Sequence, residues 1–311
     1  MPFPYLDETK ELNESARKEA DGLFIQLSDG ITHYQLGRDD SPLSLGEGLG
    51  VREVVLVHGF SVPSFIYDPT FEFLSKQGFH VLRYDLFGRG FSDRPNLKYD
   101  IHLFVKQLKE LLDKLNFKKI NLVGLSMGGP ITAKFIEQHP QYVSKHILID
   151  PAGAKPIALS PLLKIVKIPL VGELLLGLFG SGSMVKSIAS DLFTPELVEH
   201  FQKKYSIQMQ YHGFKRAILS TMRNNMLDSF LEVYEQIGKL HKPTLLFWGR
   251  QDATVPFEHS ELILKAMPHA EFHAIENCGH IPHYEKPHEV NPILLEFLKR
   301  NADLSPRSGN E

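Results

Sequence analysis

The chain has 311 residues, of which 42% are hydrophobic, and its 34 basic and 37 acidic side chains give a formal net charge of −3. This length and composition suit one large hydrophobic core with an accessory region, and the well-mixed charge offers nothing for a nucleic-acid partner. The single cysteine, Cys278, excludes an internal disulfide, so the fold does not depend on an oxidising compartment.

The first 21 residues are polar and helix-prone, and they lack the apolar core of a signal peptide. No stretch of about 18 uncharged apolar residues occurs, so no membrane-spanning segment is expected. We therefore expect a cytoplasmic protein.

The next segments predict a mostly parallel α/β sheet. Residues 23–27 and 31–36 flank Ser28-Asp29-Gly30, which predicts a hairpin, and residues 37–52 predict a long surface loop. From residue 53 onward, short apolar runs alternate with helical patterns, which is typical of a parallel sheet with helices on both faces. The predicted strands are 53–57, 80–85, 119–123, 145–150, 243–248 and 270–275.

The most informative motif is Gly124-Leu125-Ser126-Met127-Gly128, which directly follows the apolar run 120–123. A buried strand followed by G-x-S-x-G and a helix is the pattern of a nucleophile elbow, a sharp turn that presents the serine hydroxyl. Because such a turn is strained, glycines two residues either side of Ser126 remove collisions. The sequence therefore predicts Ser126 as a nucleophile.

An acid and a histidine follow later strands. Asp252 lies in a loop just after the run 244–248, and His280 follows the segment 270–275. The resulting chain order of serine, aspartate and histidine differs from both serine-protease orders. Asp150, which ends the strand after the elbow helix, is an alternative acid, and Cys278 is expected to be a buried bystander because the serine already supplies a nucleophile.

A site for a developing oxyanion is predicted from two backbone N–H groups. One is Met127, the residue after the nucleophile, and the other is Phe60, in the loop after the strand 53–57. We also expect Gly59, Val255 and Ile281 to contact the substrate.

Taken together, these motifs resemble the α/β-hydrolase-fold serine hydrolases of the esterase/lipase type. The resemblance runs from about residue 22 to residue 300 and includes the segments 84–95 and 279–287. It implies an α/β-hydrolase sheet, mostly parallel, with helices on both faces and an inserted helical cap over the nucleophile.

The strand–helix alternation breaks between about residues 153 and 236, where five helices are predicted at 159–168, 172–178, 184–192, 195–209 and 214–226. We therefore predict a core formed by residues 1–152 and 237–311 and a cap formed by residues 153–236. Within the cap, residues 156–180 are apolar, with charges only at Lys164, Lys167 and Glu173. This run either packs on the core or forms an apolar lid that touches lipid surfaces.

The expected activity is hydrolysis of small-molecule carboxylic esters, without a cofactor or metal. The expected substrates are apolar short- to medium-chain esters or monoacylglycerol-like lipids. His280, His283 and His288 fit no zinc spacing. Serine at 126 argues against the relatives that attack with aspartate. Carbon–carbon hydrolases of the same fold remain an alternative, although they typically carry asparagine where this chain has Leu125. A non-catalytic or slow small-ligand receptor is a second alternative.

Overall fold

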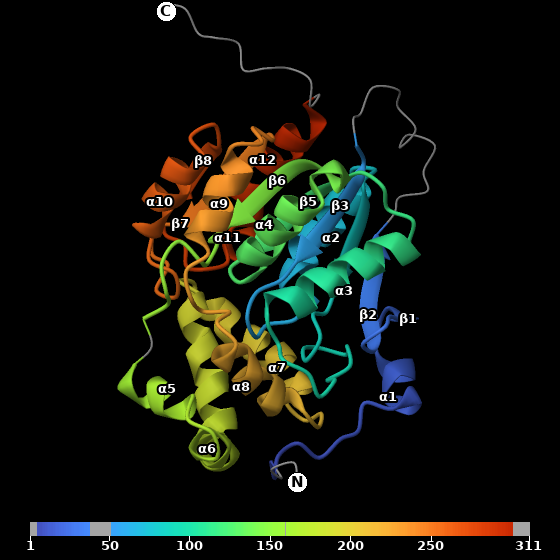
Figure 1. Cartoon of the computed structure of the whole chain (residues 1–311), viewed down its shortest axis with the longest axis vertical. Coiled ribbons are helices and arrows are strands. Elements are labelled where there is room, and N and C mark those ends of the chain that lie inside the picture. Colours follow the sequence, from blue (N-terminus) through green and yellow to red (C-terminus); the bar gives the residue numbers. More distant parts are fainter. Residues whose placement is uncertain (1–4, 38–50, 159, 301–311) are drawn as a thin grey trace, which may run out of the picture.

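The computed structural model describes residues 5–37, 51–158 and 160–300. Its centre is one eight-stranded sheet in the order β1-β2-β4-β3-β5-β6-β7-β8 (Figure 1). Strand β2 pairs antiparallel with β1 on one side and with β4 on the other, and all other pairs are parallel. The strands are β1 (Leu23–Gln26), β2 (Ile31–Gly37), β3 (Glu53–Val57), β4 (His80–Tyr84), β5 (Ile120–Leu125), β6 (Val143–Ile149), β7 (Thr244–Gly249) and β8 (Glu271–Ile275). The predicted α/β class, the hairpin and all six later strands are confirmed.

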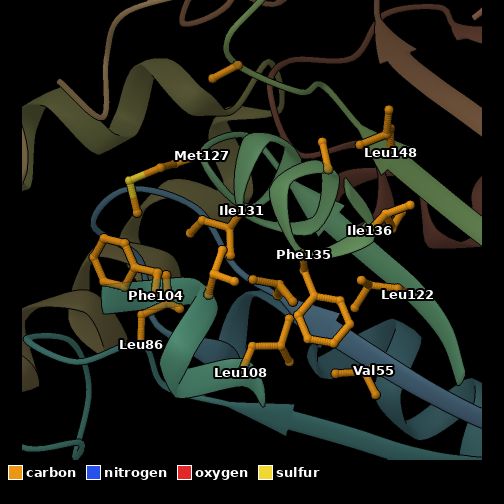
Figure 2. Close-up of a cluster of buried hydrophobic side chains, with 14 of the residues drawn as sticks. Val55, Leu86, Phe104, Leu108, Leu122, Met127, Ile131, Phe135, Ile136 and Leu148 are labelled. Carbon is orange, nitrogen blue, oxygen red and sulfur yellow. The ribbon is translucent and has the colours of Figure 1, made fainter. Parts of the chain in front are cut away.

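Two hydrophobic cores lie on opposite faces of the sheet, because successive side chains of a strand point to opposite sides. In β3, Val55 and Val57 belong to one core, and Val54 and Leu56 belong to the other. Figure 2 shows the first core, where Ile131 and Phe135 lie among residues of the sheet and of a neighbouring helix. The helices that contribute residues to this first core include α3 (Ile101–Lys114), α4 (Gly128–Gln138), α9 (Leu231–Gly238) and α10 (His259–Ala266). The helices α2 (Asp68–Lys76), α11 (Pro282–Glu285) and α12 (Pro287–Lys299) contact one another, and α12 contributes residues to the second core.

Strand β6 begins two residues before the predicted strand and places two basic side chains in the interior. Lys145 and His146 are both buried. Lys145 Nζ donates to the backbone carbonyls of Phe297, at 2.7 Å, and Leu298, at 2.9 Å, and also to that of Arg300. The ammonium group therefore satisfies carbonyls that the end of α12 leaves without helical partners.

A helical insertion follows β6. It contains α5 (Pro161–Val166), α6 (Val171–Ser187), α7 (Val198–Gln208) and α8 (Phe214–Arg223), with 3-10 turns at Ile188–Asp191 and Pro195–Leu197. Figure 1 shows these four helices together beyond one end of the sheet. The predicted helices 172–178 and 184–192 are joined, because α6 continues through Gly180 and Gly182 and passes into the first 3-10 turn. By contrast, α9 packs against α4 and α10 of the sheet layer, although the predicted boundary at 236 places most of it in the cap.

The start of the described chain is attached to this insertion by residues 5–10, which we call the N-terminal strap. The Glu8 carboxylate is buried and accepts the backbone N–H groups of Gly213 and Lys215, both at 2.6 Å. The backbone of Lys10 exchanges hydrogen bonds with Gln210 and His212. The strap therefore fixes the beginning of α8; the short helix α1 (Glu14–Glu19) follows it.

Two predictions concern other segments. The predicted surface loop 37–52 lies mostly outside the described residues, since only Gly37, the last residue of β2, and residues 51–52 are described. None of the helices in the described ranges has the length and apolar character needed to cross a lipid bilayer.

Candidate active site

Ser126 stands at a sharp turn between β5 and α4. Its φ angle is +52°, a left-handed conformation that is rare for a residue with a side chain. The turn is held by hydrogen bonds from Ser126 N–H to the Ile149 carbonyl, at 3.0 Å, and from Gly129 N–H to the Ser126 carbonyl, at 2.8 Å. A Cβ on Gly128 would lie 2.3 Å from the Val57 carbonyl oxygen, so a side chain there would break the turn. The local geometry is therefore that of a nucleophile elbow.

His280 and Asp252 form a buried hydrogen-bonded pair. His280 Nδ1 lies 2.7 Å from Asp252 Oδ2, and the other carboxylate oxygen accepts the backbone N–H groups of Thr254, at 2.8 Å, and Val255, at 2.9 Å. Burial lowers the pKa of His280, but the Asp252 carboxylate outweighs burial and the net pKa is raised above 6.5. Because Nδ1 is engaged by the acid, Nε2 is the ring nitrogen left for proton transfer.

The loop after β3 comes very close to the serine. A Cβ on Gly59 would lie 3.0 Å from Ser126 Cβ and 3.5 Å from its hydroxyl oxygen, so only glycine leaves this space open. The loop is fixed from behind by Arg89, whose Nε donates to the Phe60 carbonyl at 2.8 Å. Arg89 also donates to Thr221 of α8 and is fully buried. These hydrogen bonds hold the Gly59–Phe60 segment of the loop next to the nucleophile elbow.

A cavity of about 590 Å³ lies between the sheet edge and the helical insertion. Of the eight predicted site residues, seven line it, and Asp252 lies behind His280. The seven are Gly59, Phe60, Ser126, Met127, Val255, His280 and Ile281. The insertion contributes mainly apolar side chains, including Val166, Leu175, Leu176 and Met184. Among the described residues that line the cavity there is no lysine or arginine.

Sequence reasoning missed Asp191, the one carboxylate on the cavity wall among the described lining residues. Its carbonyl accepts the His280 backbone N–H at 2.8 Å, and its Oδ1 accepts a hydrogen bond from the Thr254 hydroxyl at 2.6 Å. Burial raises the pKa of Asp191, against the opposing effects of His280 and Thr254. No spacing in the sequence signals this residue, because only the fold brings the first 3-10 turn of the insertion against the loop that carries His280.

The alternative acid Asp150 lies next to the predicted pair. Its Oδ1 accepts the Gly249 backbone N–H at 2.9 Å, and its φ angle of +42° is left-handed. One ligand-capable atom from each of Asp150, Asp252 and His280 falls within 4.8 Å of the others, the only such group of three in the described part of the chain. Because His280 Nδ1 is already bonded to Asp252, these atoms form a hydrogen-bonded cluster and not an open set of metal ligands.

The remaining candidates lie outside this cluster. His283 is buried against the ring of Tyr67, with the ring centres 4.7 Å apart, and His288 is close to Glu289. Cys278 is buried, and burial raises the pKa of its thiol, which makes a thiolate nucleophile unfavourable. These observations agree with the prediction that Cys278 is a bystander.

A serine elbow beside a buried histidine–aspartate pair, at one end of a mostly parallel sheet, is the arrangement of the α/β hydrolases. Residues 54–293 match the sequence profile of the Alpha/beta hydrolase family, and the chain belongs to that family. The resemblance inferred from the motifs is therefore confirmed at the level of the family, and the protein is a hydrolase of this fold.

Individual relatives carry different names. The chain is 26% identical over 294 residues to a 2-hydroxy-6-oxononadienedioate/2-hydroxy-6-oxononatrienedioate hydrolase from Cupriavidus pinatubonensis, covering 88% of this chain and 94% of the relative. It is 27% identical over 303 residues to a 2-hydroxy-6-oxo-6-phenylhexa-2,4-dienoate hydrolase from Burkholderia cepacia, covering 93% and 98%. An esterase structure from Exiguobacterium antarcticum matches with a TM-score of 0.71 at 20% identity, covering 90% and 100%. The last likeness concerns the fold alone.

Proposed function

We propose that the protein is a serine hydrolase that cleaves neutral, apolar carboxylic esters through an acyl-enzyme. Ser126 attacks the ester carbonyl, and its proton passes to His280 Nε2. Asp252 holds the imidazole in the required tautomer and stabilises the imidazolium. His280 then protonates the leaving alcohol, and water attacks the acyl-enzyme by the same route.

The developing oxyanion is assigned to the backbone N–H groups of Phe60 and Met127. The closeness of Gly59 to Ser126 supports this assignment, because it brings the Phe60 peptide to the nucleophile. Arg89 supports it as well, since its bond to the Phe60 carbonyl holds that peptide in one orientation. Preorganised donors of this kind act without rearranging during the reaction.

We also propose that α5–α8 act as the cap. Their side chains line the same cavity as Ser126 and His280, and the wall they supply is mainly apolar. The cap therefore selects the part of the substrate that does not react, while the triad and the oxyanion donors, all outside the insertion, carry out the chemistry.

The observation that carries the choice of substrate is the charge of the cavity. Its described lining has no lysine or arginine and one carboxylate, Asp191. A substrate carboxylate buried there would lose its hydration without gaining a cationic partner and would face Asp191. This favours a neutral ester.

The second candidate is carbon–carbon bond hydrolysis, which is favoured by the names of relatives that are 26% and 27% identical to this chain. Those names denote mono- and dicarboxylates, and the described lining of the cavity holds no lysine or arginine to pair with a substrate carboxylate. Leu125, in place of the asparagine typical of such enzymes, weakens this candidate further.

One experiment separates the two candidates. We would compare kcat/KM for 4-nitrophenyl butyrate, for the anionic mono-4-nitrophenyl succinate and for 2-hydroxy-6-oxo-6-phenylhexa-2,4-dienoate. We expect the neutral butyrate to exceed the succinate by roughly 100-fold, because burying an unpaired carboxylate is costly. The matched variant Asp191→Asn should narrow this ratio. Turnover of the dienoate above that of the butyrate would make the protein a carbon–carbon hydrolase.

The receptor alternative is tested with the same butyrate ester. An enzyme continues to release nitrophenol after the first equivalent, whereas a receptor with a reactive serine stops after about one equivalent.

A further inference from the structure

Exposed apolar side chains are concentrated on α5, on the turn after it and on the first half of α6. Of 14 large hydrophobic residues that are exposed in the described part of the chain, seven fall within residues 163–178. We call these seven the α5–α6 apolar surface: Leu163, Ile165, Ile168, Leu170, Val171, Leu174 and Leu178. Large contiguous apolar surfaces are uncommon on monomeric proteins and mark sites of interaction.

The surface is built by one helix face and the turn before it. Val171, Leu174 and Leu178 are spaced three and four residues apart, so they form one stripe along α6. The opposite face of α6 carries Leu176 and Gly180, which line the cavity. The stripe therefore points away from the protein, and Figure 1 shows α5 and α6 at the end of the molecule distant from the sheet.

Leu170, at the turn between α5 and α6, has an unfavourable backbone conformation. Its φ angle is +68°, a conformation that leucine rarely adopts, and its side chain is 79% exposed. Neither core packing nor local propensity explains a strained leucine that faces solvent. Backbone strain of this kind is concentrated at functional sites.

Charges around the surface are positive. Between residues 160 and 180 the charged side chains are Lys164, Lys167 and Glu173. Glu173 is neutralised by Arg223 through two hydrogen bonds, at 2.6 and 2.9 Å. Lys164 is exposed and Lys167 half-buried, so an apolar patch flanked by lysines remains. This combination complements an anionic lipid surface.

The cavity and the surface are continuous at one residue. Leu163 lines the cavity and is also 42% exposed. We propose that the α5–α6 apolar surface docks the protein on anionic phospholipid membranes, so that an apolar ester enters the cavity directly from the lipid. This proposal deepens the proposed function by naming the source of the substrate.

The test is sedimentation with vesicles of phosphatidylcholine mixed with phosphatidylglycerol, and with vesicles of phosphatidylcholine alone. It uses the full chain carrying Ser126→Ala, so that binding is measured without hydrolysis and does not depend on the proposed chemistry. We expect tighter binding to the anionic vesicles, weakened by salt. The combined change Leu170→Ser, Leu174→Ser and Leu178→Ser should lower binding by roughly tenfold or more.

The matched control is Leu240→Ser, at a leucine that is 45% exposed outside this surface; it should bind as the parent does. With Ser126 restored, both variants should hydrolyse a soluble short-chain ester like the parent. The proposal is overturned if the parent does not bind anionic vesicles, or if the control loses as much binding as the triple variant. The proposal is also overturned if the triple variant binds vesicles as the parent does and differs from it only in being a monomer where the parent is a dimer, because the surface would then be a contact between two copies of the chain.

A second, independent inference concerns Asp150. Asp150 Oδ2 is buried and has no hydrogen-bond partner apart from the neighbouring Asp252 carboxylate. Two ionised carboxylates side by side and away from water are unfavourable, whereas a protonated Asp150 donates a hydrogen bond to Asp252. We infer that Asp150 is a positioning residue, a neutral carboxylic acid that holds the triad acid in place. Burial, followed by the Asp252 charge, raises the pKa of Asp150 well above its usual range, in agreement.

The groups around Asp150 are Asp252, Glu285 and the Gly249 N–H, with His280 beyond Asp252. Replacement by Asp150→Asn keeps a neutral donor of the same shape. It should preserve kcat within roughly threefold and leave the acid limb of the kcat/KM profile unchanged. Asp150→Ala removes the donor, and kcat should fall roughly tenfold or more with KM little changed.

Circular dichroism and thermal melting check that both variants fold, and labelling of Ser126 by a phosphonate checks the nucleophile separately. If Ser126 is not labelled in the parent, the proposed function fails. The positioning role of Asp150 is then judged separately, from the melting curves and structures of the two Asp150 variants. A downward shift of the acid limb in Asp150→Asn would falsify the neutral state, because it would show that a negative charge near His280 has been removed. Full activity of a folded Asp150→Ala variant would overturn the positioning role.

Discussion

The apolar wall of the cavity should make specificity depend on acyl chain length. Each methylene that enters an apolar environment gains up to about 0.8 kcal/mol, which is roughly fourfold in kcat/KM at 25 °C. From acetyl to hexanoyl esters, four added methylenes therefore give at most about 200-fold. A cavity of about 590 Å³ is in the size range that accepts a chain of this length, and the rise should reverse once the chain outgrows it.

The perturbation is Leu175→Asp, at a half-buried side chain of α6 that lines the cavity. A carboxylate in the wall removes the apolar contact, so the increase from acetyl to hexanoyl should fall to roughly tenfold or less. Acetyl-ester hydrolysis should remain within roughly threefold of the parent, because Ser126, Asp252 and His280 lie outside the insertion. The matched control is Leu178→Asp, three residues along the same helix, 61% exposed and not part of the lining.

The assay is initial-rate hydrolysis of soluble 4-nitrophenyl esters from acetyl to decanoyl, below their aggregation limits, with melting temperatures measured for every variant. A parent enzyme without a chain-length trend would refute the apolar-substrate argument and favour a small polar ester. If Leu175→Asp lost all activity together with thermal stability, the side chain would be a packing residue and not a specificity residue.

Four further outcomes are expected. Ser126→Ala should keep the fold and lower ester turnover by roughly 1000-fold or more, measured after removal of contaminating esterases. Asp252→Asn should lower kcat by up to about 10⁴-fold and far exceed the effect of Asp150→Asn; the reverse order would reassign the triad acid. Because the pKa of His280 is raised and its neutral form is the base, kcat/KM should be lost as the pH falls, with a midpoint above pH 6.5. Lys145→Met should lower the free energy of unfolding in urea by about 2–4 kcal/mol, since it leaves the carbonyls at the end of α12 unpaired.

The sheet was predictable because its central strands are buried on both faces. Runs such as 54–57 and 245–248 are continuously apolar, which is how a central parallel strand appears in a sequence. The beginning of β6 was not predictable in this way. Lys145 and His146 do not look like buried residues, and their burial depends on acceptors that the fold supplies: α12 for Lys145 and Thr132 of α4 for His146.

The site could be anticipated where chemistry imposes spacing. Ser126 is identified by its glycines, and His280 and Asp252 by their positions after strands. Asp191 could not be anticipated, because no sequence spacing relates a residue of the insertion to the loop that carries His280. The apolar run 156–180 allowed two interpretations, packing on the core or an apolar lid that touches lipid surfaces, and sequence could not separate them. The structure shows inward and outward side chains in this run, with Leu176 lining the cavity and Leu174 exposed. Contact with lipid stays a prediction.

The N-terminal strap has a practical consequence for anyone who produces this protein. Glu8 and Lys10 fix the beginning of α8, and α8 in turn supplies Met222 to the cavity wall. A change that disrupts the strap is therefore expected to displace α8 and alter substrate selection without touching the triad. Figure 1 shows α12, the last helix, towards the opposite end of the molecule from the strap.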